Sequence, residues 1–178
     1  LRLAVVLAQV LQRRRIVLVE LFRVMLGKQD RRGLARVPGL QRLELLIDFV
    51  KNEVRDGEAL KDEPTVRHKV AQLATHAEVA RVLGLKFVAK STMGGKPPTG
   101  EASMYKLFAT SLSKKLADAS MDIGGTGSQL RVGTEEAPMK GRAESTYRYT
   151  VIDTIGGGAS EIQKNVIARR HLNLPKNF

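Results

Sequence analysis

The sequence has no cysteine and no tryptophan, and aromatic residues make up only 4% of its 178 residues. The absence of cysteine excludes disulfides, thiolate metal ligands and cysteine nucleophiles. It also fits a reducing compartment, so we predict a cytoplasmic protein. With so few aromatic side chains, Leu, Val, Ile, Ala and Met must fill the interior, which favours packing between helices.

Long apolar runs are missing as well. Two apolar stretches within residues 1–26 are interrupted by the charged run Gln12–Arg15. Neither stretch reaches the ~20 residues that a membrane-spanning helix needs, so we predict no membrane span.

Acidic residues are scarce relative to basic ones, with 18 against 30, and the formal net charge is +12. Such a charge can attract nucleic acid, an anionic membrane or a phosphorylated ligand. The three Tyr and five Phe are scattered and form no nucleic-acid module with stacking aromatics. We therefore predict no nucleic-acid partner. Charge-driven binding to nucleic acid or to a membrane stays a third hypothesis, which steep salt dependence would reveal.

Strand patterns are weak throughout, whereas apolar residues recur at three- and four-residue steps. This periodicity predicts helices over residues 40–54, 64–90, 101–121, 143–155 and 160–170. Residues 55–63 form a charged loop in this interpretation. The apolar stripe of the second helix includes Val79, and the last helix is predicted to begin with Ser160 as N-cap and Gln163 three residues on.

The predicted fold class is all-α, an antiparallel helix bundle with short connections. Residues 40–178 form the bundle. Residues 1–39, which end in the Gly- and Pro-rich stretch Gly27–Gly39, form a separate N-terminal helical or linker segment.

Histidine and serine give no sign of a metal or hydrolase site. His68 and His76 are eight residues apart, and no carboxylate pair has ligand spacing with them or with His171, so we predict no metal site. The serines of the third predicted helix lack a convincing base partner. They are Ser103, Ser111 and Ser113.

Three ordered motifs carry more specific information. The clearest runs from Ile155 to Arg169 as IGGGASEIQKNVIAR, and LNLP follows at 172–175. Another joins EASMYKLF at 101–108 to the glycine-rich stretch Gly124–Gly127, and DEPTVRHKVA at 62–71 precedes both. In this order, from roughly residue 64 onward, the motifs resemble the C-terminal helical domain of flavin-dependent acyl-CoA dehydrogenases.

The resemblance implies FAD-dependent oxidation of an acyl-CoA thioester to its 2,3-enoyl form. In the family, the flavin takes a hydride from the β carbon while a carboxylate removes the α proton. A complete subunit also has another helical domain and a middle β domain, so we expect this chain to be the flavin-facing C-terminal part of a larger enzyme. Family members build a tetramer core from these bundles, and neighbours complete each flavin site. The expected partners are acyl-CoA and a second subunit, identical or of related type.

The resemblance also assigns site residues. The cofactor-binding positions are Gly124, Gly125, Gly127, Ala159, Ser160 and Glu161, and the substrate-binding position is Gly158. Glycines let the backbone approach a pyrophosphate closely. The alternative is that these glycines serve only as helix caps and tight turns.

Several positions depart from the family pattern. The position of the frequent catalytic Glu is Gly157, which has no side chain to take a proton. Some members place the base at the start of the first helix of this domain, where Asp30 is the acidic residue nearest a matching place; the alternative for Asp30 is a solvated loop carboxylate. Side chains that contact flavin in many relatives are replaced by Met121, Glu53, Asp56 and Ala159. A non-catalytic helical assembly module derived from the family is therefore the second hypothesis.

Overall fold

The computed structural model describes residues 38–93 and 98–175 and confirms the all-α class. The helices in these residues are α3 (Pro38–Asn52), α4 (Pro64–Thr92), α5 (Thr99–Gly124), α6 (Arg142–Ile155) and α7 (Ser160–Val166). A π-helical turn, η4 (Ile167–His171), continues α7. The connections contain the 3-10 turns η1 (Leu60–Asp62), η2 (Thr126–Gln129) and η3 (Pro138–Gly141). None of the helices in the described residues is long and apolar enough to cross a bilayer.

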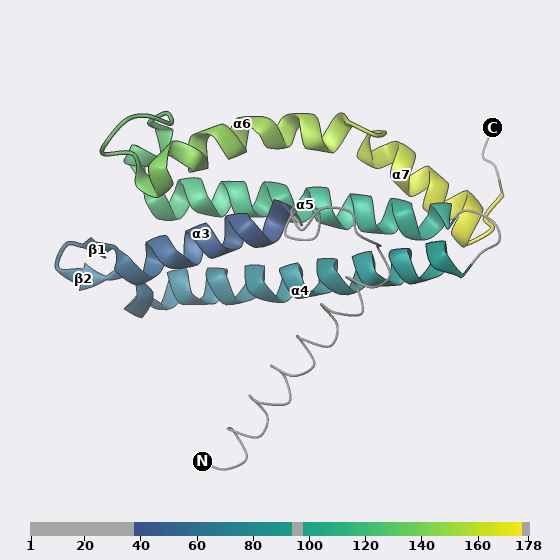
Figure 1. Cartoon of the computed structure of the whole chain (residues 1–178), viewed down its shortest axis with the longest axis horizontal. Coiled ribbons are helices and arrows are strands. Elements are labelled where there is room, and N and C mark those ends of the chain that lie inside the picture. Colours follow the sequence, from purple (N-terminus) through teal and green to yellow (C-terminus); the bar gives the residue numbers. More distant parts are fainter. Residues whose placement is uncertain (1–37, 94–97, 176–178) are drawn as a thin grey trace, which may run out of the picture. The chain divides into compact units, whose positions relative to one another are not determined.

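Helix α5 is the centre of the bundle, because α3, α4, α6 and α7 all pack against it. Figure 1 shows α4 along one side of α5, and α6 followed by α7 along the other. From α3 to α6, successive helices run in opposite directions, as the sequence predicted. The junction between α6 and α7 lies against the first half of α5, whereas the glycine-rich stretch follows the other end of α5.

Aliphatic side chains fill the space between α3, α4 and α5. Leu46 of α3 and Leu116 of α5 have exposed fractions of 0%. Burying a leucine side chain contributes about 1.5–3 kcal/mol, so this seam holds the three helices together. The other buried members are Leu43, Val50, Leu60, Val66, Leu73, Ala77, Ala80, Leu112, Ala119 and Ile123.

A short β-hairpin stands within the segment that the sequence predicted as a charged loop. Its strands are β1 (Val54–Arg55) and β2 (Glu58–Ala59), which pair in antiparallel register. Asp56 and Gly57 form the turn with φ angles of 53° and 85°. An Asp-Gly pair is favoured in two-residue hairpin turns because both positions need positive φ.

Two side-chain predictions are wrong. Val79 is 41% exposed, and the buried stripe of α4 passes through Ala77 and Ala80 instead. Ser160 does not cap α7: the N-cap is Ala159, and no side chain bonds to the helix end there. The side chain of Gln163 is engaged by carbonyl groups in the preceding turn, so it does not complete a capping box. The domain boundary at residues 39 and 40 stays a prediction, because residues 1–37 are not described.

Candidate functional site

The first candidate segment is the glycine turn, Gly124–Gly127, which ends α5. Gly125 has a φ of 68°, and its N–H donates to the carbonyl of Asp122 at 3.3 Å. A Cβ on Gly124 would stand 2.0 Å from Ser128 Oγ, and one on Gly127 would stand 3.1 Å from Pro138 Cδ. Internal packing therefore accounts for Gly124 and Gly127 without any ligand. This agrees with the alternative that these glycines serve helix caps and tight turns.

Arg55 brings a positive charge to the glycine turn. Its Nη2 donates to the carbonyl of Ile123 at 2.8 Å and stands 3.5 Å from the place of a Cβ on Gly125. The hairpin turn directly after Arg55 positions β1 next to the end of α5. Lys69 of α4 adds a second cation, 2.9 Å from the exposed carboxylate of Asp122. Because guanidinium groups bind phosphate oxygens well, Arg55 and the backbone at Gly125 fit a phosphate-bearing ligand.

Sequence reasoning missed Arg55. The family's arginine position falls on Glu53, and the contact between Arg55 and Ile123 joins residues 68 positions apart. The available local signal was the Asp56-Gly57 pair, which marks the hairpin that carries Arg55.

The second candidate segment is the glycine elbow, Gly156–Gly158, between α6 and α7. Gly157 has a φ of 70°, and a Cβ there would meet nothing within 4 Å. Gly158 has a φ of 100°, and its Cβ would stand 2.8 Å from Gln163 Nε2. Gly158 is thus required by the turn and by Gln163, whereas Gly157 faces open space.

Two side chains hold the carbonyl groups of the glycine elbow. Lys106 of α5 donates from Nζ to Gly158 O at 2.7 Å and makes a longer contact of 3.5 Å with Thr154 O. Gln163 of α7 donates from Nε2 to Gly157 O at 2.8 Å and to Gly158 O at 3.2 Å. Sequence reasoning did not single out Lys106, because its partners lie 48 and 52 residues further along the chain.

The other predicted cofactor positions follow the glycine elbow. Ala159 precedes α7, while Ser160 is half-buried and Glu161 is exposed in its first turn. They lie far from the glycine turn, because 18 residues of α5 separate Lys106 from Gly124. At the helical rise of 1.5 Å per residue this is about 27 Å. The fold does not bring the two predicted groups together within one chain.

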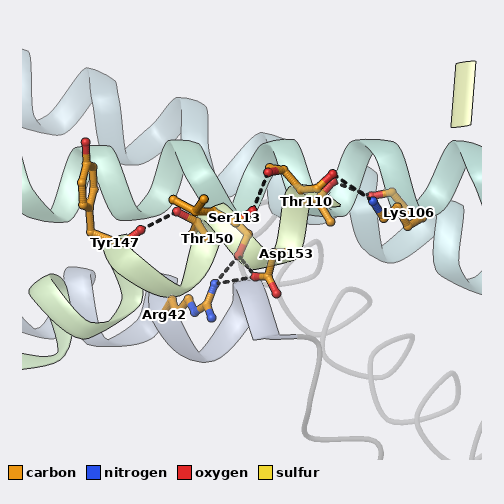
Figure 2. Close-up of polar contacts among 9 residues, drawn as sticks. Arg42, Lys106, Thr110, Ser113, Tyr147, Thr150 and Asp153 are labelled. Atoms are coloured by element: carbon orange, nitrogen blue, oxygen red, sulfur yellow. Dashed lines mark hydrogen bonds and ion pairs between the residues drawn. The ribbon is translucent and has the colours of Figure 1, made fainter. Parts of the chain in front are cut away.

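Ser113 takes part in a network that joins three helices. Its hydroxyl accepts a hydrogen bond from Arg42 of α3 and donates to Asp153 of α6 at 3.3 Å. Figure 2 shows these three side chains pointing toward one another. With Ser113 only 5% exposed and held between two charged groups, the arrangement is a structural link between helices.

His76 and His171 contact different kinds of side chain. The rings of His76 and Phe108 lie nearly perpendicular, at 84°, with ring centroids 6.1 Å apart. His171 Nδ1 lies 3.7 Å from the buried carboxylate of Glu101, which also accepts a hydrogen bond from Lys90. The Lys90 hydrogen bond is the main reason that the pKa of Glu101 lies below its ordinary value, against the opposing effect of burial. Among the described residues, no three His, Asp or Glu side chains gather as metal ligands would.

Two positions bear on the catalytic base: Asp30, the one candidate, and Gly157, where many relatives carry a Glu. Asp30 lies outside the described residues. Gly157 occupies the exposed tip of the elbow and has no group that could accept a proton. Any carboxylate that removes the α proton must therefore come from another position than Gly157.

The described residues thus form an antiparallel bundle with a glycine turn after its central helix and a glycine elbow before its last helix. The sequence model of the family "Acyl-CoA dehydrogenase, C-terminal domain" matches residues 37–172. The chain therefore belongs to this family.

Relatives are similar to the chain in sequence, and solved structures are similar to it in fold. The chain is 32% identical over 123 residues to acyl-CoA dehydrogenase FadE26 of Mycobacterium tuberculosis, which covers 67% of this chain and 30% of FadE26. It is similar in fold to the ChsE4-ChsE5 complex from the same organism, with a TM-score of 0.72, 27% identity, and coverage of 79% of this chain and 36% of that one. The FAD complex of PigA has a TM-score of 0.64 at 18% identity, with 76% and 33% covered. The chain thus spans about a third of the length of these proteins.

Proposed function

We propose that this chain is the flavin-facing, oligomerising C-terminal domain of an FAD-dependent acyl-CoA dehydrogenase that oxidises an acyl-CoA thioester to its 2,3-enoyl form. The observation that carries the proposal is the placement of Arg55 on the glycine turn of a domain that belongs to this family. When bound, FAD supplies the acceptor for the hydride that leaves the β carbon.

The glycine turn is the proposed binding site for the FAD pyrophosphate. Arg55 Nη2 already binds the carbonyl of Ile123, so its guanidinium is fixed beside Gly125 with other N–H donors in its fork. Gly125 has a positive φ and no side chain, and the atoms nearest the place of its missing Cβ belong to the Arg55 guanidinium. Gly124 and Gly127 shape the turn through packing. Gly124 lies one residue before Gly125, and Gly127 lies two residues after it.

The glycine elbow is the proposed substrate side of the domain. The backbone of Gly158 and the following Ala159, Ser160 and Glu161 would face the acyl-CoA and the flavin. Gly157 cannot remove the α proton, so we propose that the base comes from Asp30 or from another subunit. The ChsE4-ChsE5 complex, which is similar in fold, joins two differently named proteins, and this supports the second source.

Association with a second subunit is supported by two observations. The glycine turn and the glycine elbow are about 27 Å apart along α5, so we propose that they serve different flavin sites of an assembly. Large apolar side chains are also exposed on α6 and α7. They are Val151, Ile152, Ile155 and Ile162, with exposed fractions from 54% to 64%. Exposed apolar surface of this kind is typical of a protein interface.

An absorbance spectrum of the purified chain at its native mass, with and without added FAD, tests the proposal. We expect flavin bands that travel with the protein, and a loss of affinity of about tenfold or more in Arg55→Met, which removes charged hydrogen bonds. Arg81→Met is the control, because Arg81 lies on α4 12 residues beyond Lys69, about 18 Å further along the helix from the glycine turn, and pairs with Glu78. An oligomeric helical protein that never retains flavin would overturn the cofactor site and favour the non-catalytic assembly module.

A further inference from the structure

The end of α6 leaves carbonyl groups that need donors from elsewhere. Helices end with unpaired carbonyls, and cations are favoured next to them because of the helix dipole. The elbow satisfies part of this need itself: Gly156 N–H donates to Ile152 O at 2.8 Å, and Gly158 N–H donates to Ile155 O at 3.2 Å. The carbonyls of Thr154 and Gly158 then face the ammonium group of Lys106.

Lys106 is unusual among the lysines of the bundle in the groups that it binds. Both of its hydrogen bonds in the described structure go to main-chain carbonyls, whereas Lys69, Lys90 and Lys114 pair with carboxylates. Lys106 is half-buried on α5, the central helix of the bundle. Its ammonium group therefore fixes the elbow to α5 through main-chain carbonyls and not through an ion pair.

Gln163 of α7 holds the same elbow. It binds Gly157 O and Gly158 O from α7, so Gly158 O is shared between Lys106 and Gln163. Gly157 has no side chain of its own, and a Cβ there would meet nothing within 4 Å. The position of Gly157 is thus set by its backbone, which Gln163 bonds directly and Lys106 restrains through the next residue, beside the elbow's own main-chain hydrogen bonds.

We propose that Lys106 is a positioning residue for acyl-CoA oxidation: its ammonium group holds the glycine elbow in the conformation that faces the substrate. The role in catalysis rests on the proposed function, but the hold on the elbow does not. Without Lys106, the carbonyls of Thr154 and Gly158 lose their cation, and Gln163 alone is a weaker restraint because it travels with α7.

Hydrogen exchange on the complete 178-residue chain tests the hold directly. In Lys106→Met, which keeps an unbranched apolar side chain but removes the ammonium group, we expect amides of residues 156–163 to exchange about tenfold faster, as the loss of a charged hydrogen bond predicts. Amides of α3 and α4 should keep their rates. The control is Lys115→Met, an exposed lysine on the same helix. Lys106→Arg, which keeps the charge and the donors, should restore most of the protection.

Two results would overturn the hold. Equal acceleration across all helices in Lys106→Met would show a general loss of stability, and unchanged exchange at residues 156–163 would show that Lys106 does not restrain the elbow. If Lys106→Met does not fold, Lys106→Gln gives the same comparison with a polar replacement. Faster exchange confined to the elbow supports the proposal even in a chain that binds no flavin, so its outcome is separate from that of the cofactor test.

A kinetic experiment tests the catalytic part in the flavin-loaded, assembled enzyme. If Lys106 positions the elbow against the reacting carbons, Lys106→Met should lower kcat by about tenfold or more with a smaller change in KM, because the contribution of Lys106 is made in the transition state. Lys115→Met should leave both constants unchanged. A rise in KM with an unaltered kcat would overturn the positioning role in the reaction.

Discussion

Arg42 of α3 and Asp153 of α6 lie 3.8 Å apart, with the hydroxyl of Ser113 from α5 placed between them. The two charged residues are far apart in the sequence and meet because α3 and α6 both pack on α5. Their side chains are only 20% and 25% exposed, so this pair is less screened by water than the bundle's surface pairs. The contact ties the first described helix to the one that leads into the glycine elbow.

Asp153→Asn should destabilise the bundle by about 1–2 kcal/mol, because Arg42 and Ser113 lose their charged partner in a partly buried place. Asp118→Asn is the matched control: Asp118 pairs with Lys114 at 3.1 Å on an exposed face of α5. Such a surface pair contributes only about 0.3–0.5 kcal/mol. Urea unfolding of both variants measures the difference. Equal losses in the two variants would contradict the role given to the network.

Gly158→Ala should lower the free energy of unfolding more than Gly133→Ala does. Both glycines have nearly the same φ, 100° and 99°, but a Cβ on Gly133 meets nothing within 4 Å and one on Gly158 meets Gln163. The shared backbone strain costs about 1–2 kcal/mol. At Gly158 alone, the new methyl group also displaces the Gln163 amide from its bonds to the elbow carbonyls, which adds about 0.5–1.5 kcal/mol. Thermal unfolding measures both.

The double variant Gly158→Ala with Gln163→Ala separates strain from crowding. It removes the side chain that the new methyl group would meet, so the cost should be less than the sum of the two single changes. Strict additivity would show that Gln163 is not what requires a glycine at 158.

The stability of the protein should fall at acid pH in part through Glu101. The hydrogen bond from Lys90, followed by a bond to the Glu101 backbone, lowers the pKa of this carboxyl from its ordinary value of 4.5. A lowered pKa in the folded state contributes stability that is fully present above the ordinary value. This contribution is lost as the pH falls through the lower value of the folded state.

Melting temperatures of the native chain and of Glu101→Gln, followed from neutral pH downward, measure this contribution. The difference in melting temperature between the two proteins should narrow as the pH falls below the ordinary glutamate pKa of 4.5. Curves that stay parallel over the whole range would mean that Glu101 gains no stability from its ionised form.

Leu116→Ala should destabilise the bundle by about 2–5 kcal/mol, because it leaves a cavity between α3, α4 and α5. Ile152→Ala is the control, since Ile152 is 61% exposed on α6. In dilute solution this surface change should stay within about 0.5 kcal/mol. At high protein concentration, a larger effect of Ile152→Ala would indicate that α6 takes part in an interface between subunits.

Local signals placed the helices well. Pro64 stands at the start of α4, where its missing N–H and fixed φ suit a helix, and Gly125 ends α5 with a positive φ. The Asp56-Gly57 pair was an equally local signal for the hairpin, although the charged residues around it favoured a loop. The exposure of Val79 was not predictable from periodicity, because a neighbouring position of the helix also fits an apolar stripe.

By itself, the sequence determined the helical class, the family motifs and the lack of a carboxylate at Gly157, because these depend on residue type and short-range spacing. Only the tertiary structure decided which glycines are needed for packing, that Arg55 reaches Ile123 and that Lys106 reaches the elbow. These contacts join residues 52 to 68 positions apart, and their geometry is fixed by how α5 packs against its neighbours. The same packing places the glycine turn and the glycine elbow at different levels of α5, which no local pattern encodes.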